Sequence, residues 1–224
     1  MILISLLLLL AAASPDAFAD NFERGLGSAW AASQQIDGRL DVVPGQGGKV
    51  LRARTQARRE RVPKAALIAR PAKLAAGATV RVTFDVMVPE GAPLNSIHLV
   101  DLECASCGEG GNPGIRLYLR HGRLRIDRSK IGQFPTWADN DATSLRHGRW
   151  HRIELEIRAG FGDSGRARVQ LDGATVLTGL GDTIFRPKGG ATAGADRVQI
   201  GLTASSNPGS AIAYFDNVRV TISR

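Results

Sequence analysis

The sequence contains few of the residues on which familiar catalytic motifs depend. Among its 224 residues are two cysteines, two tyrosines and four histidines, and aromatic residues make up only 5%. It has no glycine-rich phosphate loop, no G-x-S-x-G and no H-E-x-x-H. The sequence therefore offers no motif for a nucleotide-dependent enzyme, an α/β-hydrolase or a zinc protease.

Long hydrophobic runs are also missing. Residues 1–13 are almost wholly apolar, but a bilayer span needs about 20 such residues, and no later segment is longer. Ala17, Phe18 and Ala19 follow this run as an A-x-A cleavage site. We therefore expect a secretory signal over residues 1–19, one domain over residues 20–224, a secreted or periplasmic location and no membrane span.

Acidic residues are in the minority. The formal charge is +8, and it becomes +9 without residues 1–19, which hold one acid and no base. A basic protein favours anionic partners. Export argues against nucleic acid, so we expect an anionic polysaccharide instead. The alternative is that the charge only provides solubility or reflects an arginine-rich coding bias.

The two cysteines stand close together, as Cys104 and Cys107. With no second pair and no βαβ pattern, a zinc site is excluded and a redox motif is disfavoured. An exported chain favours a short disulfide that shapes the loop over residues 103–113. The alternative is a catalytic thiol pair.

No segment has a convincing helical pattern. Short alternating runs separated by Gly, Pro, Asn and Asp predict strands instead, at residues 40–43, 49–54, 80–88, 96–103, 115–127, 150–157, 167–171, 198–203 and 214–222. Residues 64–74 are ambiguous between a strand and a loop. We predict an all-β fold, an antiparallel β-sandwich of the jelly-roll type.

The stretch IRLYLRHGRLRIDRSK, residues 115–130, shows the clearest alternation. Its leucines and isoleucines point one way, while four arginines, Tyr118 and Asp127 point the other. His121 and Gly122 interrupt it with turn chemistry, which predicts a hairpin. Arginine donates two parallel hydrogen bonds to carboxylates and sulfates, so this face suits an extended polyanion.

Several fragments together resemble the concanavalin-A-like lectin and glucanase superfamily. They are DNFE (20–23), GRWHRIEL (148–155), GRARVQLDG (165–173), VQIG (198–201) and FDNV (215–218). Within it, GIRLYL (114–119) and GRLRIDR (122–128) are most similar to heparin-lyase-like and glucuronan-lyase-like polysaccharide lyases. The resemblance implies two packed antiparallel sheets, a glycan groove and cleavage of uronic-acid polymers by β-elimination, with no obligatory metal.

Such a reaction needs a base, an acid and a group that neutralises the uronate carboxylate. His98, in NSIH (95–98), resembles the Q-I-H strand motif of jelly-roll alginate lyases and is the candidate base, with Asn95 as neutraliser. Tyr118, between Arg116 and Arg120, is the candidate acid. The alternatives are a histidine packed at a strand edge and an amphipathic tyrosine on a sheet surface.

Further cations could bind substrate. The basic run over residues 52–61 includes Arg54, Arg59 and Arg61 and faintly resembles the R-x-E-x-R motif of these lyases, although a solvated face is the alternative. Lys130 could extend the groove. The lyases' Y-F-K-A-G-x-Y motif would fall at residues 198–205, where this chain has VQIGLTAS and lacks both Tyr and Lys.

Jelly rolls of this superfamily often bind Ca²⁺ where the N-terminal segment meets the last strand. Glu23 and Asp216, with backbone oxygens near Gly47, supply suitable hard ligands. Asp216 shares strand parity with Val218, so we expect it to face inward. The alternative is a hydrogen-bonded aspartate at a strand end.

The leading hypothesis is a monomeric secreted polysaccharide lyase that acts on an anionic, uronic-acid polymer and requires no cofactor, with the calcium as an optional structural ion. The main alternative is a non-catalytic carbohydrate-binding or adhesion module of the same fold. A glycoside hydrolase is disfavoured, because Asp101 and Glu103 have the spacing of paired carboxylates but the third acid of E-x-D-x-x-E is missing.

Overall fold

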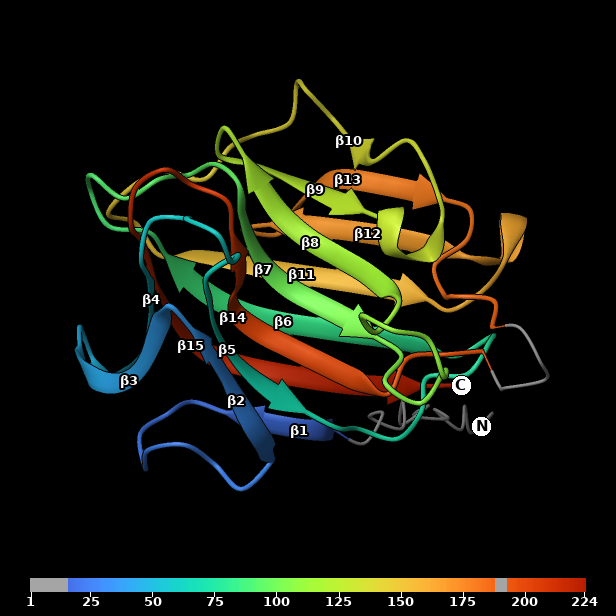
Figure 1. Ribbon diagram of the computed structural model, residues 1–224, viewed down its shortest axis with the longest axis horizontal. Coiled ribbons are helices and arrows are strands. Elements are labelled where there is room, and N and C mark those ends of the chain that lie inside the picture. The colour runs from blue at the N-terminus through green and yellow to red at the C-terminus, as the bar shows by residue number, and fades with distance from the viewer. Residues whose placement is uncertain (1–15, 188–192) are drawn as a thin grey trace, which may run out of the picture.

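The computed structural model describes residues 16–187 and 193–224, and it contains two antiparallel sheets packed face to face. Figure 1 shows the layer with β7, β8, β9 and β14 in front of the layer with β6, β11, β12 and β15. The predicted all-β sandwich is therefore confirmed.

One layer, here called sheet A, has the order β13-β12-β11-β6-β15-β4-β3, and β1 also pairs with β15. Its strands are β1 (Asp16–Asp20), β3 (Gly38–Gly45), β4 (Gly48–Thr55), β6 (Thr79–Met87), β11 (His151–Arg158), β12 (Arg166–Leu171), β13 (Ala174–Leu180) and β15 (Ala211–Ser223).

The other layer, sheet B, has the order β10-β9-β8-β7-β14-β5-β2. Its strands are β2 (Trp30–Ile36), β5 (Lys64–Ala69), β7 (Ile97–Glu103), β8 (Gly114–Arg120), β9 (Arg123–Asp127), β10 (Trp137–Ala138) and β14 (Arg197–Ser205). Two short 3₁₀ turns, η1 (Ser129–Ile131) and η2 (Gly162–Ser164), complete the described elements.

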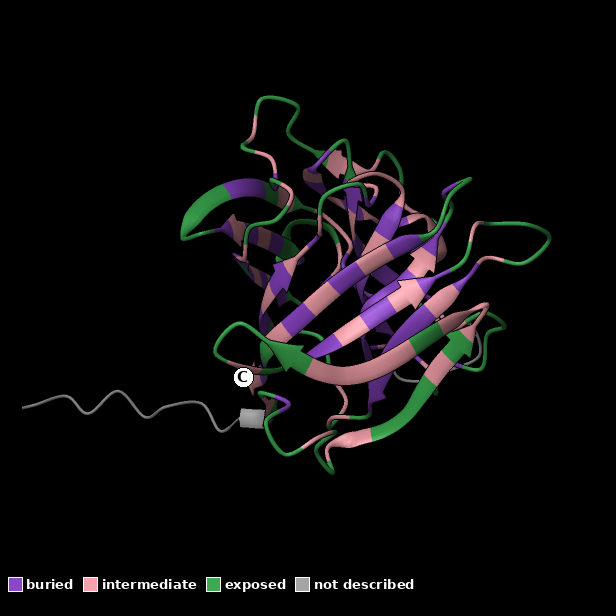
Figure 2. Cartoon of the chain, turned by 90° about the vertical axis from the view of Figure 1, so that its left-hand side faces the viewer, coloured by how far each residue is buried: buried purple, intermediate pink, exposed green. Residues whose placement is uncertain are grey.

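The core lies between the sheets and follows from the alternation of the strands. In β11, for example, Ile153, Leu155 and Ile157 are buried, while Glu154 and Glu156 are only partly so. Figure 2 shows buried and more exposed residues alternating along the strands. Burial of these apolar side chains is the main force that holds the two layers together.

The predicted hairpin is present as β8 and β9. Its two-residue turn is formed by His121 and Gly122, both with positive φ (52° and 74°). This is the backbone that a tight right-twisted hairpin requires. Across it, Tyr118 pairs with Arg125, and Arg116 pairs with Asp127, so the charged row does share one face.

The N-terminal strand β1 is part of the sandwich. Phe18 is 8% exposed, and its ring lies 5.1 Å from that of Trp30, edge to face. Cleavage after Ala19 would remove Phe18 from this contact. Residues 1–15 of the expected leader lie outside the described residues. Of the helices within the described ranges, none is long and apolar enough to cross a membrane.

Candidate functional site

The two residues predicted to carry the chemistry lie side by side on the outer face of sheet B. His98 in β7 is opposite Tyr118 in β8, and their rings stack with centroids 5.2 Å apart and planes inclined by 29°. Both side chains therefore face the same side of the sheet.

A hollow of about 290 Å³ lies over this ring pair. We call it the His98 hollow; it is lined by Asn95, Ser96, His98, Tyr118, Arg120, His121 and Ser206. Its size is at the lower end of the roughly 300–1,000 Å³ typical of small-molecule sites. Four predicted residues, His98, Tyr118, Arg120 and Asn95, thus meet in one place.

Asn95 reaches the hollow through a local irregularity of the backbone. Ser96 has a positive φ of 54°, and the Asn95 side-chain oxygen accepts a hydrogen bond from the His121 N–H at 3.2 Å. Asn207 donates to the Asn95 carbonyl oxygen at 2.7 Å and thereby fixes the segment. This bend allows Asn95 and His98, three residues apart, to line the same hollow.

His98 is a neutral imidazole in a positive field. Burial and, after it, the nearby Arg116, Lys64 and Lys130 together lower its pKa to about 3, while Asp127 opposes them with an effect larger than that of either lysine. Its Nδ1 atom is buried and has no hydrogen-bond partner. A neutral ring can accept a proton, and the surrounding cations favour an anionic ligand.

Two of the other histidines are occupied elsewhere. His151 is buried, and it contacts Asp172 Oδ2 through Nδ1 (2.8 Å) and accepts from the Arg146 N–H through Nε2 (3.0 Å). His147 Nε2 lies 2.7 Å from the Ala92 carbonyl oxygen. These contacts explain both residues as structural.

Beside the hollow, the outer face of sheet B forms a buried polar floor. We use this name for Asp101, Glu103, Arg116, Asp127, Lys130, Arg197, Gln199 and Thr203. Glu103, 3% exposed, accepts from Lys130 and from Gln199 (2.7 Å) and pairs with Arg197 (3.4 Å). Arg116 is paired with Asp127 and also donates to Ser129 Oγ at 3.2 Å.

Asp101 lies at the centre of this floor. It is 3% exposed and accepts a hydrogen bond from Thr203 Oγ1 at 2.7 Å. Burial, together with the neighbouring Glu103, raises the pKa of its carboxyl to about 6. A carboxyl that changes charge near pH 6 is unusual in a structural role and marks a candidate functional region.

The outer face of sheet B, including three residues of the floor, also carries polar atoms without a hydrogen-bond partner. Eleven buried side-chain nitrogen or oxygen atoms of the described residues have no hydrogen-bond partner, and six of them lie on the outer face of sheet B. They are Gln34 Oε1, His98 Nδ1, Arg116 Nε, Arg125 Nε, Arg197 Nε and Gln199 Oε1. Such atoms are costly without a partner, which is what a face built for a polar ligand would show.

The remaining predicted cations have other positions. Lys130 is on the same face but is held by Glu103. Arg59 and Arg61 are in the loop between β4 and β5, where Arg61 pairs with Asp37 at 3.0 Å. A cation that the sequence did not indicate is Lys64, at the start of β5, the strand next to β14. Its charge lies near enough to His98 to lower the pKa of that residue. Residues 64–69 show no alternation, so nothing in the sequence indicated that Lys64 stands on this face.

For calcium, one expectation was wrong. Asp216 does not face the core, because Asn217 has a positive φ of 49° and forms a bulge that reverses the parity before Val218. It lies opposite Asp85 on the outer face of sheet A. Burial raises its pKa, and so do the nearby carboxylates of Asp85, Glu23 and Asp20.

Glu23 and Asp216 come from opposite ends of the chain, and the Glu23 carboxylate lies near enough to raise the pKa of Asp216. Mutual repulsion of carboxylates is what a cation would relieve, so the two fit Ca²⁺ in charge. Glu23 Oε1 accepts the Lys49 N–H at 3.0 Å. Within residues 16–187 and 193–224, no three His, Cys, Asp or Glu side chains form a metal-binding group, so backbone oxygens would have to complete a shell.

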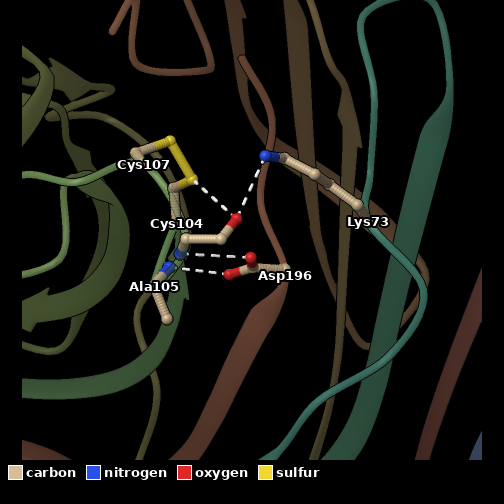
Figure 3. The surroundings of a disulfide bond; sticks show 6 residues. Lys73, Cys104, Ala105, Cys107 and Asp196 are labelled. Atoms are coloured by element: carbon tan, nitrogen blue, oxygen red, sulfur yellow. Dashed lines mark hydrogen bonds between the residues drawn. A yellow bond between two sulfur atoms is a disulfide. The ribbon is translucent and has the colours of Figure 1, made fainter. Parts of the chain in front are cut away.

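The predicted disulfide joins Cys104 to Cys107 directly after β7 (Figure 3). Asp196 accepts hydrogen bonds from the N–H groups of Ala105 (2.6 Å) and Ser106 (3.2 Å), and Lys73 donates to Ser106 Oγ (3.1 Å). The loop is therefore held from both sides. With both sulfurs bonded to each other, the structure favours the structural role over a thiol pair.

Comparison with known proteins supports the fold. No protein-family model and no curated protein sequence matches the chain. Among solved structures, it is similar to endo-β-1,4-glucuronan lyase from the fungus Trichoderma reesei, with a TM-score of 0.71 at 15% identity over 92% of this chain and 95% of that chain.

Alginate lyase vAL-1 from Chlorella virus follows with a TM-score of 0.56, 15% identity, and coverage of 90% and 96%. A carbohydrate esterase from Shiga toxin-encoding bacteriophage phi24B has a TM-score of 0.58, 14% identity, and coverage of 95% and 100%. The chain therefore has the β-sandwich fold found in polysaccharide lyases. Identities this low establish the fold and leave the activity to the site itself.

Proposed function

We propose that this protein is a secreted or periplasmic lyase that cleaves an anionic, uronic-acid polysaccharide by β-elimination. The observation that carries the proposal is the His98 hollow. A neutral histidine stacks on a tyrosine there, among cations, in a fold shared with glucuronan and alginate lyases.

In the proposed reaction, His98 takes the C5 proton of a uronate whose carboxylate is bound by Arg120 and the amide of Asn95. The electrons of the C5–H bond form a C4=C5 double bond, and the C4–O4 bond breaks. Tyr118 donates its proton to the departing O4. One new reducing end and one unsaturated uronate result, so atoms and electrons balance without an oxidant.

A pKa of about 3 makes His98 a weak base before substrate binds. A substrate carboxylate brings a negative charge next to the ring, which favours its protonated form and raises its basicity. The positive field that lowers the pKa is the same field that attracts the carboxylate. The base would therefore gain strength only in the complex, where it is needed.

The decisive experiment follows the ultraviolet absorbance of the unsaturated uronate over polyglucuronate, alginate, polygalacturonate and heparan sulfate. We expect absorbance to rise on at least one polymer, and Tyr118→Phe to lower kcat about a hundredfold while binding remains. Tyr214→Phe is the matched control, because it removes the other phenol, on sheet A, and should leave kcat unchanged.

The alternative is a non-catalytic carbohydrate-binding module. The sequence of β14 favours this alternative. Gln199 and Thr203 lie in the segment where the lyases that this sequence resembles carry Tyr and Lys. Retained binding with no absorbance change on any polymer would establish this alternative and overturn the lyase proposal.

A further inference from the structure

A second group of arginines lies on the other layer, at the β3–β4 side of sheet A. Arg39, Arg52 and Arg54 all contact the single carboxylate of Asp41, at 2.7, 3.3 and 3.0 Å. Burial alone would raise the pKa of Asp41, but these three guanidinium groups hold it below its usual value. The cluster therefore keeps an excess of positive charge even with Asp41 ionised.

In the middle of the same face of sheet A, on β6, β11 and β12, arginines and carboxylates contact each other in equal numbers. Arg81 contacts both Glu154 and Glu156, and Arg168 contacts the same two carboxylates. Two cations thus meet two anions there, whereas three cations meet one anion at Asp41.

A hollow of about 470 Å³ opens beside the cluster. Arg39 and Arg54 line it together with Gln56, Ser210 and Ile212. The Arg39 side chain is 71% exposed and that of Arg54 is 43% exposed, so both are accessible to a ligand. Arg52 Nε, Arg54 Nε and Thr55 Oγ1 are buried without a hydrogen-bond partner.

We propose that Arg39, Arg52 and Arg54 form a second binding site for the carboxylate or sulfate groups of an acidic polysaccharide, separate from the His98 hollow. Guanidinium groups bind such oxyanions with paired, charge-assisted hydrogen bonds. Gln56 and Ser210 offer hydrogen bonds to sugar hydroxyls, and Ile212 offers an apolar surface to a sugar ring. Only the ligand class rests on the proposed function.

The two hollows flank one connection. Ser206 lines the His98 hollow and Ser210 lines the second one, so the segment between β14 and β15 borders both. The Arg58 N–H donates to the Asn207 carbonyl oxygen at 2.9 Å, which places the basic loop between β4 and β5 beside this segment. A polymer longer than the His98 hollow can therefore meet further cations on this side of the molecule.

The test measures binding in a His98→Ala background, so that the polymer stays intact whether or not the lyase proposal is correct. Affinity electrophoresis through gels containing polyglucuronate or heparan sulfate compares Arg39→Gln/Arg54→Gln with Arg168→Gln/Arg81→Gln, which removes the same charge from the balanced part of sheet A. We expect about tenfold weaker binding for the first double variant and less than twofold for the second.

Equal losses in the two double variants would show that only net charge matters and would overturn the site. So would unchanged binding of Arg39→Gln/Arg54→Gln with a native circular dichroism spectrum. A loss on heparan sulfate alone identifies sulfate as the ligand group, and a loss on both polymers identifies the carboxylate. A neutral β-glucan gel should retard none of the variants.

Discussion

The outer faces of the two sheets are both lined by charged residues, but they treat charge differently. On sheet A, Glu154 and Glu156 keep side-chain exposures of 26% and 27% and pair with arginines that are more exposed still. On sheet B, the Glu103 side chain is 4% exposed and pairs with Lys130 and Arg197 in the polar floor.

The alternating pattern in the sequence is the same for both faces, so it cannot distinguish them. What differs is burial and the number of polar atoms left without a partner. A solvated face satisfies its charges with water and neighbours at little net gain, whereas buried charges need dedicated partners or a ligand. This difference is the reason that we propose sheet B as the face that carries the activity.

The largest expected effect comes from breaking the floor. Glu103→Gln keeps the shape of the side chain but leaves Lys130 and Arg197 without their buried anion. We expect unfolding free energy to fall by about 4 kcal/mol, measured by urea denaturation at neutral pH. A loss under about 1 kcal/mol would mean that the floor is solvated like sheet A, and the comparison would fail.

The two faces should also respond to pH with opposite sign. The pKa of Asp101 is raised from 3.8 to about 6 in the folded protein, so the folded state holds a proton that the unfolded state releases. The stability of the folded state therefore falls as the pH rises from 3.8 to about 6, by about 3 kcal/mol in all. On sheet A, burial by itself would raise the pKa of Glu156, but Arg81 and Arg168 outweigh burial and lower it. The contribution of Glu156 to stability therefore increases as the pH rises.

Asp101→Asn tests this, because asparagine stays neutral and can still accept the Thr203 hydrogen bond. The variant should gain stability relative to the original protein between pH 4 and pH 6, the window set by those two pKa values, and keep that gain at pH 7. His98, whose pKa is lowered, acts in the opposite direction in both proteins and cancels in the difference. If the stability difference between the variant and the original protein does not change with pH, Asp101 is in contact with water and the prediction is wrong.

The fold could be predicted from the sequence because strand alternation and turn residues are local signals. The hairpin of β8 and β9 and the disulfide appear where expected. The failures are at backbone irregularities. The bulge at Asn217 turns the Asp216 side chain to the outer face instead of the core. A bulge in β7 near Leu99 brings His98 and Asp101 to one face. The strand β5 was ambiguous in the sequence because both of its faces are buried. None of these has a signal in strand periodicity.

The N-terminal strand β1 belongs to sheet A, so the predicted cleavage site can sharpen the comparison. A protein that begins at Asp20 lacks Phe18 and most of β1. We expect it to be less stable than one that begins at Ser14 by about 2 kcal/mol, because a buried aromatic contact with Trp30 is lost. Thermal unfolding of both proteins measures the difference, and mass spectrometry of the exported protein identifies the natural N-terminus. Equal stabilities would show that β1 contributes nothing to sheet A.

We also propose that Ca²⁺ binds sheet A at Glu23 and Asp216. Millimolar Ca²⁺ should raise stability by about 1.5 kcal/mol relative to EDTA, and Asp216→Asn should remove the effect. Mg²⁺ is the control ion, because it demands a tighter octahedral shell. A melting temperature that is the same in Ca²⁺ and EDTA would contradict the site without affecting the lyase proposal.

The smallest expected effect is on the balanced part of sheet A. Glu156→Gln removes one of two carboxylates shared by Arg81 and Arg168, but all three side chains are partly exposed and Glu154 remains within reach of both arginines. We expect a loss of about 0.5 kcal/mol that shrinks further in high salt, because exposed ion pairs are screened. Urea denaturation at low and high salt measures it beside Glu103→Gln. If the two carboxylates cost the same amount, burial does not separate the two faces, and the assignment of sheet B as the functional face loses its energetic basis.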